Sequence, residues 1–180
     1  RLLEHLLPLL LSSNAPRVVI TASDVHNPLS GGGRVGRSAN LGTLEGLRSG
    51  SGFAMVDGGT FDADKAYKDS KLCNVLLGRE LSRRLAEYES PFPVLSWSPG
   101  LVIPRGNEGF FRTSRACNPL GMTLFALLAR DVLRLTETPA RAGELLADLC
   151  VDNRWSDAGF HYLSNHLIRP GQHRFEAVNT

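Results

Sequence analysis

Two short apolar segments on either side of a helical pattern constrain the fold of this chain more than any other feature. They are "RVVITA" (Arg17–Ala22) and "FPVLSW" (Phe92–Trp97), and the helical pattern covers Ala66–Glu89 between them. Continuous apolar runs of this length are typical of strands buried on both faces of a parallel sheet. Parallel strands need a crossover connection, and the intervening helix supplies it. The order of these segments predicts an α/β protein.

Further segments continue this alternation. Thr138-Pro139 combines a hydroxyl N-cap with proline at the first helical position, so we expect a helix to begin there. "GFHYLS" (Gly159–Ser164) is a third strand candidate, and the tail after it is expected to be a loop. Helical patches in Leu120–Leu135 are expected to pack their leucines and phenylalanines into the core. Asn27–Gly59 is rich in glycine and lacks periodicity, which predicts an extended loop or insertion with a binding role.

The opening segment, "RLLEHLLPLLLSSNAP", has the leucine content of a signal peptide, but Glu4 and His5 interrupt its apolar stretch. We interpret it as the end of an amphipathic helix whose beginning lies upstream, so we expect the chain to be a fragment. The longest apolar runs, Leu6–Leu11 and Leu120–Ala129, are too short to cross a bilayer.

Composition narrows the class of protein. With 180 residues, 42% of them hydrophobic and 21% charged, the chain suits one soluble globular domain with its own core. A net charge of +2 without a clustered basic face gives no indication of nucleic-acid binding. Cys73, Cys117 and Cys150 are odd in number and far apart, which argues against a disulfide framework or zinc site and favours a reducing compartment. We expect all three thiols to be buried or partly buried, and we expect no metal site.

The segment "KAYKDSKLCN", residues 65–74, carries the most specific chemistry in the chain. On a helix, where residues advance by about 100° each, Tyr67, Lys71 and Asn74 share one narrow face. A free tyrosine has a pKa of about 10, and a lysine ammonium one turn away favours the phenolate and lowers that value. The phenol then becomes a usable proton donor. Ser23, at the end of the first strand, is placed to orient the tyrosine if strand and helix are neighbours.

Two polar residues on an ordinary helix face are the alternative to a catalytic pair, because a Tyr-x-x-x-Lys pattern often occurs by chance. Three features favour catalysis. A serine follows a buried strand upstream, a second buried strand follows downstream, and that strand ends in Pro99-Gly100. This order resembles the second half of the short-chain dehydrogenase/reductase pattern, whose fold is a doubly wound sheet with the nicotinamide site at the carboxyl ends of its strands.

Three longer segments carry a closer resemblance. "MVDGGTFDADKAYKDSKLCNVL" (Met55–Leu76) and "NLGTLEGL" (Asn40–Leu47) strongly resemble light-dependent protochlorophyllide oxidoreductases, and Asn40–Leu47 is similar to that family's characteristic insertion. "ITASDVHNP" (Ile20–Pro28) ends in a His-Asn-Pro that is also similar to the family. The resemblance implies the carboxyl-terminal part of a Rossmann-like, doubly wound parallel sheet. It further implies a single domain over residues 1–180, with the insertion at residues 27–59.

The same resemblance implies an activity, the light-driven, NADPH-dependent reduction of the ring D double bond of protochlorophyllide in chlorophyll biosynthesis. Tyr67 would deliver the proton, while Lys71 would hold the nicotinamide ribose and lower the pKa of the tyrosine. Ser23 would occupy the family's hydroxyl position. Pro99 and Gly100 would border the cofactor.

The substrate contacts that the resemblance implies are Ser23, His26, Asn74 and Leu101, although a loop-capping role for His26 is equally open. A plastid location is implied for a plant or alga, and the cytoplasm and thylakoid surface for a cyanobacterium. Beyond the pigment, we also consider peripheral membrane association and a homo-oligomer, and we expect no nucleic-acid partner.

The chain departs from the family pattern at two places. After the second strand the family usually has Pro-Gly-Cys, whereas Leu101 stands here and can neither donate a proton nor act as a ligand. The glycine-rich turn that would cradle the dinucleotide pyrophosphate is absent, since "GGGRVGRSANLG" (Gly31–Gly42) does not lie between a first strand and a helix. Two alternatives therefore stay open: a divergent short-chain dehydrogenase/reductase for another hydrophobic ring or carbonyl compound, and a non-catalytic pigment-binding remnant.

Overall fold

The computed structural model describes residues 2–89, 91–106 and 111–179. The helices are α1 (Leu2–Leu11), α2 (Glu45–Arg48), α3 (Ala63–Leu85), α4 (Phe111–Cys117), α5 (Pro119–Ala126) and α6 (Pro139–Val151). The strands are β1 (Val18–Thr21), β2 (Pro93–Ser98), β3 (Gly159–Arg169) and β4 (Gln172–Ala177). Short 3-10 turns occur at η1 (Asp24–His26) and η3 (Asn153–Trp155), and a π-helical segment, η2 (Leu127–Val132), continues α5.

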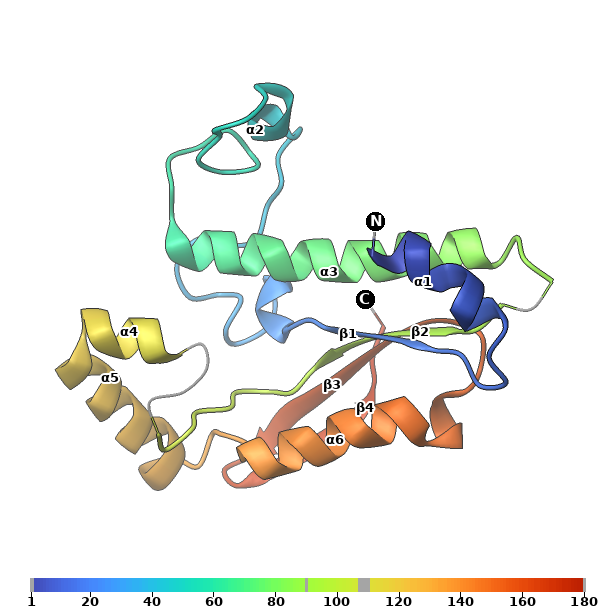
Figure 1. Cartoon of the computed structure of the whole chain (residues 1–180). Coiled ribbons are helices and arrows are strands. Elements are labelled where there is room, and N and C mark those ends of the chain that lie inside the picture. Colours follow the sequence, from blue (N-terminus) through green and yellow to red (C-terminus); the bar gives the residue numbers. More distant parts are fainter. Residues whose placement is uncertain (1, 90, 107–110, 180) are drawn as a thin grey trace.

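The four strands form one sheet in the order β1-β2-β3-β4. The pairs β1–β2 and β2–β3 are parallel, and β4 returns antiparallel to β3. Figure 1 shows α1 and α3 on one face of the sheet and α6 on the other. This arrangement confirms the predicted α/β class, with helices on both sides of a mostly parallel sheet.

Strand β2 is fully buried because its alternate residues face two different helix layers. Leu95 and Trp97 pack with Leu145 and Leu149 of α6. Val94, pointing the opposite way, packs with Leu85 at the end of α3. The uninterrupted apolar pattern of this strand therefore reflects a core on both sides.

Helix α3 begins and docks through specific residues. The carboxylate of Asp62 accepts a hydrogen bond from the backbone N–H of Lys65, which caps the helix at its amino end. Near the middle, Gly78 allows the helix to approach the sheet closely. An added Cβ there would lie 2.7 Å from both the Phe160 ring and the Ser96 hydroxyl.

Several expectations about burial and secondary structure were wrong. Strand β1 is only partly buried, because β2 covers one of its edges and it forms the border of the described sheet. The tail expected to be a loop forms β4, which pairs with the extended end of β3. The three cysteine side chains are exposed, contrary to the burial predicted for them, and they are Cys73, Cys117 and Cys150.

The apolar residues of Leu120–Leu135 are also largely exposed instead of filling the core. Leu120 is 85% exposed and Leu124 57%. Only the small residues Ala126 and Ala129 are buried there, where they pack against Ile103. The apolar pattern predicted the helix correctly, but it did not predict that most of its large apolar side chains are exposed.

The close approach at Gly78 predicts an unusual response to alanine. Alanine normally stabilises a helix relative to glycine, but at Gly78 its methyl group would collide with Phe160 and Ser96. Gly78→Ala should therefore destabilise the protein by about 1–3 kcal/mol in urea unfolding.

Gly143, in the exposed part of α6, is the matched control because an added Cβ meets nothing within 4 Å. Gly143→Ala should stabilise the protein by about 0.5–1 kcal/mol. Equal effects of the two substitutions would show that α3 does not press against the sheet at Gly78.

Candidate active site

The carboxyl ends of the parallel strands and the first half of α3 lie at the same side of the molecule (Figure 1). Ser23 lies two residues after the end of β1, and Pro99-Gly100 follows β2 directly. Because α3 begins at Ala63, Tyr67 and Lys71 lie in its first turns, beside the end of β1. The fold thus brings together the serine, tyrosine and lysine that the sequence pattern singled out.

Lys71 and Asn74 share the helix face that contacts β1, as the sequence predicts. The Lys71 ammonium donates to the carbonyl oxygen of Thr21 at 3.2 Å, and the Asn74 side-chain amide donates to the same oxygen at 3.0 Å. The Lys71 ammonium also lies 5.5 Å from the centroid of the Tyr67 ring. Thr21, the last residue of β1, is therefore the residue at which the side chains of α3 are hydrogen-bonded to the sheet.

The phenol of Tyr67 is half-buried, and its surroundings affect its acidity in two directions. Burial raises the pKa of Tyr67 above its ordinary value of 10.0, and a side-chain hydrogen bond with Ser23 partly opposes the rise. The expectation that Lys71 holds this pKa below its ordinary value is therefore wrong for the structure as it stands. Burial also lowers the pKa of Lys71 itself. Both groups are thus shifted toward their neutral forms.

His26 takes the loop-capping position that the sequence left open. It is 8% exposed, and its Nδ1 lies 2.7 Å from the carbonyl oxygen of Ser23. Its ring meets the Tyr162 ring edge-on, with centroids 5.2 Å apart. The histidine therefore supports the turn that carries Ser23, and a direct substrate contact stays a prediction.

The Pro99-Gly100 turn is fixed against β3. Gly100 has φ +79°, and an added Cβ would lie 2.5 Å from the carbonyl oxygen of Asn165, so glycine is required twice over. The buried side chain of Asn165 donates to the carbonyl oxygen of Pro99 at 3.2 Å. Leu101, next along the chain, is 37% exposed, and its carbonyl oxygen accepts from the backbone N–H of Glu137.

Sequence reasoning missed the two lysines that attach the insertion to α3. Lys65 is 2% exposed and donates to the carbonyl oxygen of Asn40 at 2.6 Å, while pairing with Asp69 at 2.6 Å and Asp57 at 3.0 Å. Burial alone would lower the pKa of Lys65, but the hydrogen bonds to the two carboxylates outweigh it and raise the pKa. The Asn40 backbone N–H in turn donates to Asp69 at 2.8 Å.

Lys68 makes the second attachment. It is 1% exposed, donates to the carbonyl oxygens of Val35 and Arg37, and pairs with Asp64 one turn earlier at 2.9 Å. Figure 1 shows the insertion with α2 rising above the amino end of α3. The i, i+4 spacing of lysines and aspartates was the available signal, but on exposed helices the same spacing usually marks a solvated ion pair.

A polar cluster beside Ser23 was also missed. Asp24 contacts Tyr162 and Ser164 of β3, and its backbone N–H donates to Ser98 at the end of β2. These residues are adjacent only in the fold, so their spacing in the sequence gave no signal.

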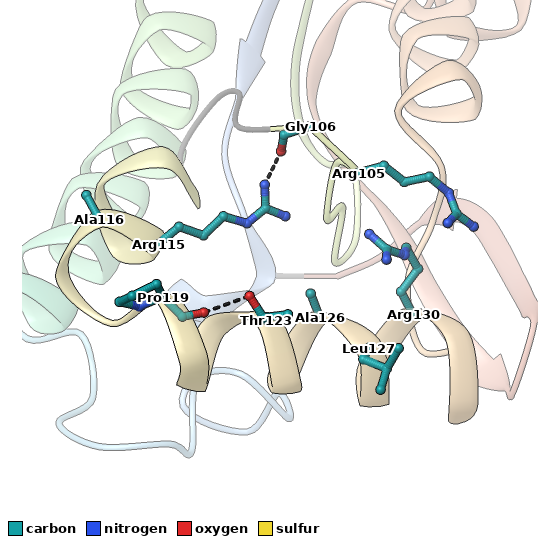
Figure 2. Close-up of a pocket in the computed structure, with 9 residues that line it drawn as sticks. All are labelled: Arg105, Gly106, Arg115, Ala116, Pro119, Thr123, Ala126, Leu127 and Arg130. Carbon is teal, nitrogen blue, oxygen red and sulfur yellow. Dashed lines mark hydrogen bonds between the residues drawn. The ribbon is translucent and has the colours of Figure 1, made fainter.

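A cavity of about 450 Å³ lies among α4, α5, η2 and the segment after β2. Figure 2 shows Arg115 reaching across it to the carbonyl oxygen of Gly106, and Arg115 also donates to Pro104 at 2.7 Å. Arg105 and Arg130 both pair with Asp131, whose pKa the Arg130 guanidinium lowers. Since these arginines already have partners within the protein, they stabilise the wall of the cavity and give it a basic surface.

Two classes of feature are absent from the part of the chain that the structure describes. No group of three or more histidine, cysteine, aspartate or glutamate side chains is arranged to hold a metal ion. Within the same residues, none of the helices has the length and apolar content needed to span a membrane.

Comparison with known proteins identifies relatives of this chain, although no family model matches it. It is 36% identical over 171 residues to "Protochlorophyllide reductase B, chloroplastic" of Oryza sativa subsp. japonica, covering 92% of this chain and 41% of the rice protein. It is 35% identical over 154 residues to "Protochlorophyllide reductase, chloroplastic" of Pisum sativum, covering 83% of this chain and 37% of that protein. It is 34% identical over 153 residues to "Protochlorophyllide reductase A, chloroplastic" of Arabidopsis thaliana, covering 83% of this chain and 36% of that protein.

These alignments confirm the resemblance predicted from the sequence. They extend along most of this chain, which spans about two-fifths of the length of the curated relatives it matches. The chain is therefore a relative of one part of the protochlorophyllide reductases.

The hydrogen bond between Ser23 and Tyr67 predicts a measurable change in acidity. Since this bond opposes the rise in the pKa of Tyr67, Ser23→Ala should raise that pKa further. A pH titration of the tyrosine ring carbons by NMR would follow it directly. Ser70→Ala is the control, because the Ser70 hydroxyl donates to the backbone carbonyl of Tyr67 and not to the phenol. If the pKa of Tyr67 is unchanged in Ser23→Ala, Ser23 does not interact with the phenol.

The buried ion pairs of Lys65 predict how the insertion responds when this lysine is replaced. Lys65→Met would leave the carboxylates of Asp69 and Asp57 without their shared cation, and breaking a buried pair in this way costs about 3–5 kcal/mol. Hydrogen exchange should accelerate at the backbone amides of residues 35–59. Arg83→Ala, which breaks exposed pairs with Glu80 and Glu87, is the control and should leave that exchange unchanged. Protection that survives in Lys65→Met would mean that the insertion is held by other contacts.

Proposed function

We propose that this chain is the catalytic carboxyl-terminal part of a plastid reductase that uses NADPH and light to reduce the ring D double bond of protochlorophyllide. The observation that carries the proposal is the convergence of Ser23, Tyr67 and Lys71 at the carboxyl end of β1. The alignments with proteins named as chloroplastic protochlorophyllide reductases support this substrate class and compartment. The product would enter chlorophyll biosynthesis.

Tyr67 is the proton donor in this proposal. Its raised pKa keeps the phenol protonated at neutral pH, so the proton is present when the substrate arrives. As negative charge develops on the ring D carbon, the phenol O–H transfers its proton to that carbon. The Ser23 hydroxyl and the Lys71 ammonium then stabilise the phenolate that remains, which lowers the barrier to transfer.

Lys71 also suits the ribose of a nicotinamide cofactor. Its ammonium has three donors, and Thr21 is the one hydrogen-bond acceptor found for it among the described residues. The other donors are available for ribose hydroxyls, with Tyr67 alongside. When bound, NADPH would supply the hydride. Contacts to the cofactor pyrophosphate are not assigned to this chain, because its sequence holds no glycine-rich turn between a first strand and a helix.

The insertion and the turns around the site have supporting roles. Through Lys65 and Lys68, the insertion is held at the amino end of α3, where it would cover the pigment and exclude water. Gly100 keeps the turn after β2 close to β3, and in this proposal Pro99 and Gly100 border the nicotinamide.

A divergent short-chain dehydrogenase/reductase with another hydrophobic ring or carbonyl substrate is the second candidate. Leu101 favours it, because this 37% exposed apolar side chain stands where the resembled family usually has a cysteine. The two functions differ in substrate, while both use Tyr67 as the acid.

The test uses the longest natural protein that contains this chain, mixed with NADPH and protochlorophyllide in the dark and then illuminated. A red shift in the pigment absorption, present only after illumination, is the expected result. Tyr67→Phe should retain pigment binding and lower the conversion rate by about 10²–10⁴-fold, because the proton donor is lost.

Tyr88→Phe is the matched control, since Tyr88 follows α3 at the far end from Tyr67 and should convert at the unmodified rate. Full conversion by Tyr67→Phe would exclude the tyrosine as the acid. Dark conversion of a carbonyl compound without any pigment binding would favour the second candidate.

A further inference from the structure

Asp24 lies directly after Ser23 and connects the turn after β1 with the end of β2 and the middle of β3. Its carboxylate accepts hydrogen bonds from the Tyr162 phenol at 2.9 Å and the Ser164 hydroxyl at 2.7 Å, both on β3. Its backbone N–H donates to the Ser98 hydroxyl at 3.1 Å, where β2 ends. A single residue thus links the turn after β1 to its two neighbouring strands.

The partners of Asp24 are buried, which makes these bonds rigid. Tyr162 and Ser164 are 3% exposed and Ser98 is 1% exposed. Burial, followed by the negative charge of Asp24, raises the pKa of Tyr162, so this phenol stays protonated and remains a donor. A side-chain hydrogen bond with Ser98 acts on the same phenol. Unpaired polar groups at this depth would be costly, so the cluster tolerates few alternative arrangements.

The other groups of the turn are held as well. The Asp24 carbonyl oxygen accepts from the Asn27 backbone N–H at 3.0 Å and from the Ser30 hydroxyl at 2.7 Å. His26 contacts the Ser23 carbonyl oxygen and packs on the Tyr162 ring. These bonds hold the backbone around Ser23, whose side chain forms the hydrogen bond with Tyr67.

We propose that Asp24 is a positioning residue, which fastens the turn of Ser23 to β3 and thereby aims the Ser23 hydroxyl at the Tyr67 phenol. Its catalytic meaning rests on the function proposed above, in which Tyr67 donates the proton. In this proposal Asp24 acts through Ser23 and is not itself a catalytic residue. A carboxylate is needed because two hydroxyl donors converge on it, and an amide has only one oxygen to accept them.

The first test needs no enzyme activity, because it measures the pKa of Tyr67 by NMR titration. If Asp24 acts through Ser23, Asp24→Ala should raise the Tyr67 pKa by about as much as Ser23→Ala does. If the carboxylate acted only as a nearby negative charge, its removal would lower that pKa. The two explanations therefore predict opposite signs.

A double-substitution cycle makes the test stricter. In a Ser23→Ala background, Asp24→Ala should produce no further rise in the Tyr67 pKa, because the bond it would disturb is already gone. Additive rises, or a fall in the single variant, would overturn the proposal. Tyr162→Phe, which removes one of the two donors, should give a smaller rise and serves if Asp24→Ala does not fold.

The second readout is photoreduction by the longest natural protein containing the chain. Asp24→Ala should lower kcat by about tenfold or more with little change in KM, since it misaligns a group without removing a substrate contact. Asp24→Asn should recover part of the loss, because the amide oxygen still accepts one hydroxyl. Asp152→Ala is the matched control, as Asp152 pairs with Arg154 beyond the end of α6.

Failure of the two proposals can be told apart. If the unmodified protein does not convert the pigment, the proposed function fails, while the Tyr67 titration still decides the role of Asp24. If conversion occurs and Asp24→Ala retains both kcat and the Tyr67 pKa, the positioning role is wrong and the proposed function stands.

Discussion

The close contact between α3 and the sheet at Gly78 is the constraint on which the rest of the structure depends. It leaves no room for a methyl group between the helix, Ser96 and Phe160. Because a helix is rigid along its length, this contact and the two hydrogen bonds to Thr21 fix the depth and rotation of α3. Every functional side chain on the helix takes its position from that docking.

The fixed rotation divides the polar residues of α3 between two tasks. Tyr67 and Lys71 face the end of β1, where the chemistry is proposed, while Lys65 and Lys68 face the insertion. Buried lysines are tolerated only when paired, and here each has at least one carboxylate and at least one backbone carbonyl oxygen as partners. The charged residues of "KAYKDSK" therefore serve two purposes, because the same end of α3 carries the proposed acid, Tyr67, and holds the insertion.

Periodicity predicted the parts of this fold in which local pattern and burial agree. It predicted the strands around Val94 and Phe160, the helix α3, and the helix face that Tyr67 and Lys71 share. It failed for β4, since a pattern of half-exposed residues has no strong signal, and for Leu120, since an apolar helix face does not reveal what covers it. The contacts of Asp24 lie some 140 residues apart in the chain, so only the fold reveals them.

The acidity of Tyr67 connects these observations. A nearby ammonium was expected to lower the pKa of the phenol, yet burial dominates and raises it. In the proposed reaction, a phenol that is a weaker acid in the resting site is still effective, because its proton is needed only when charge develops on the substrate. At that moment the stabilisation of the phenolate matters more than the resting pKa, and it depends on how accurately Ser23 and Lys71 are held. In the proposed reaction, that accuracy depends on the hydrogen bonds of α3 to Thr21 and on the contacts of Asp24 with β3.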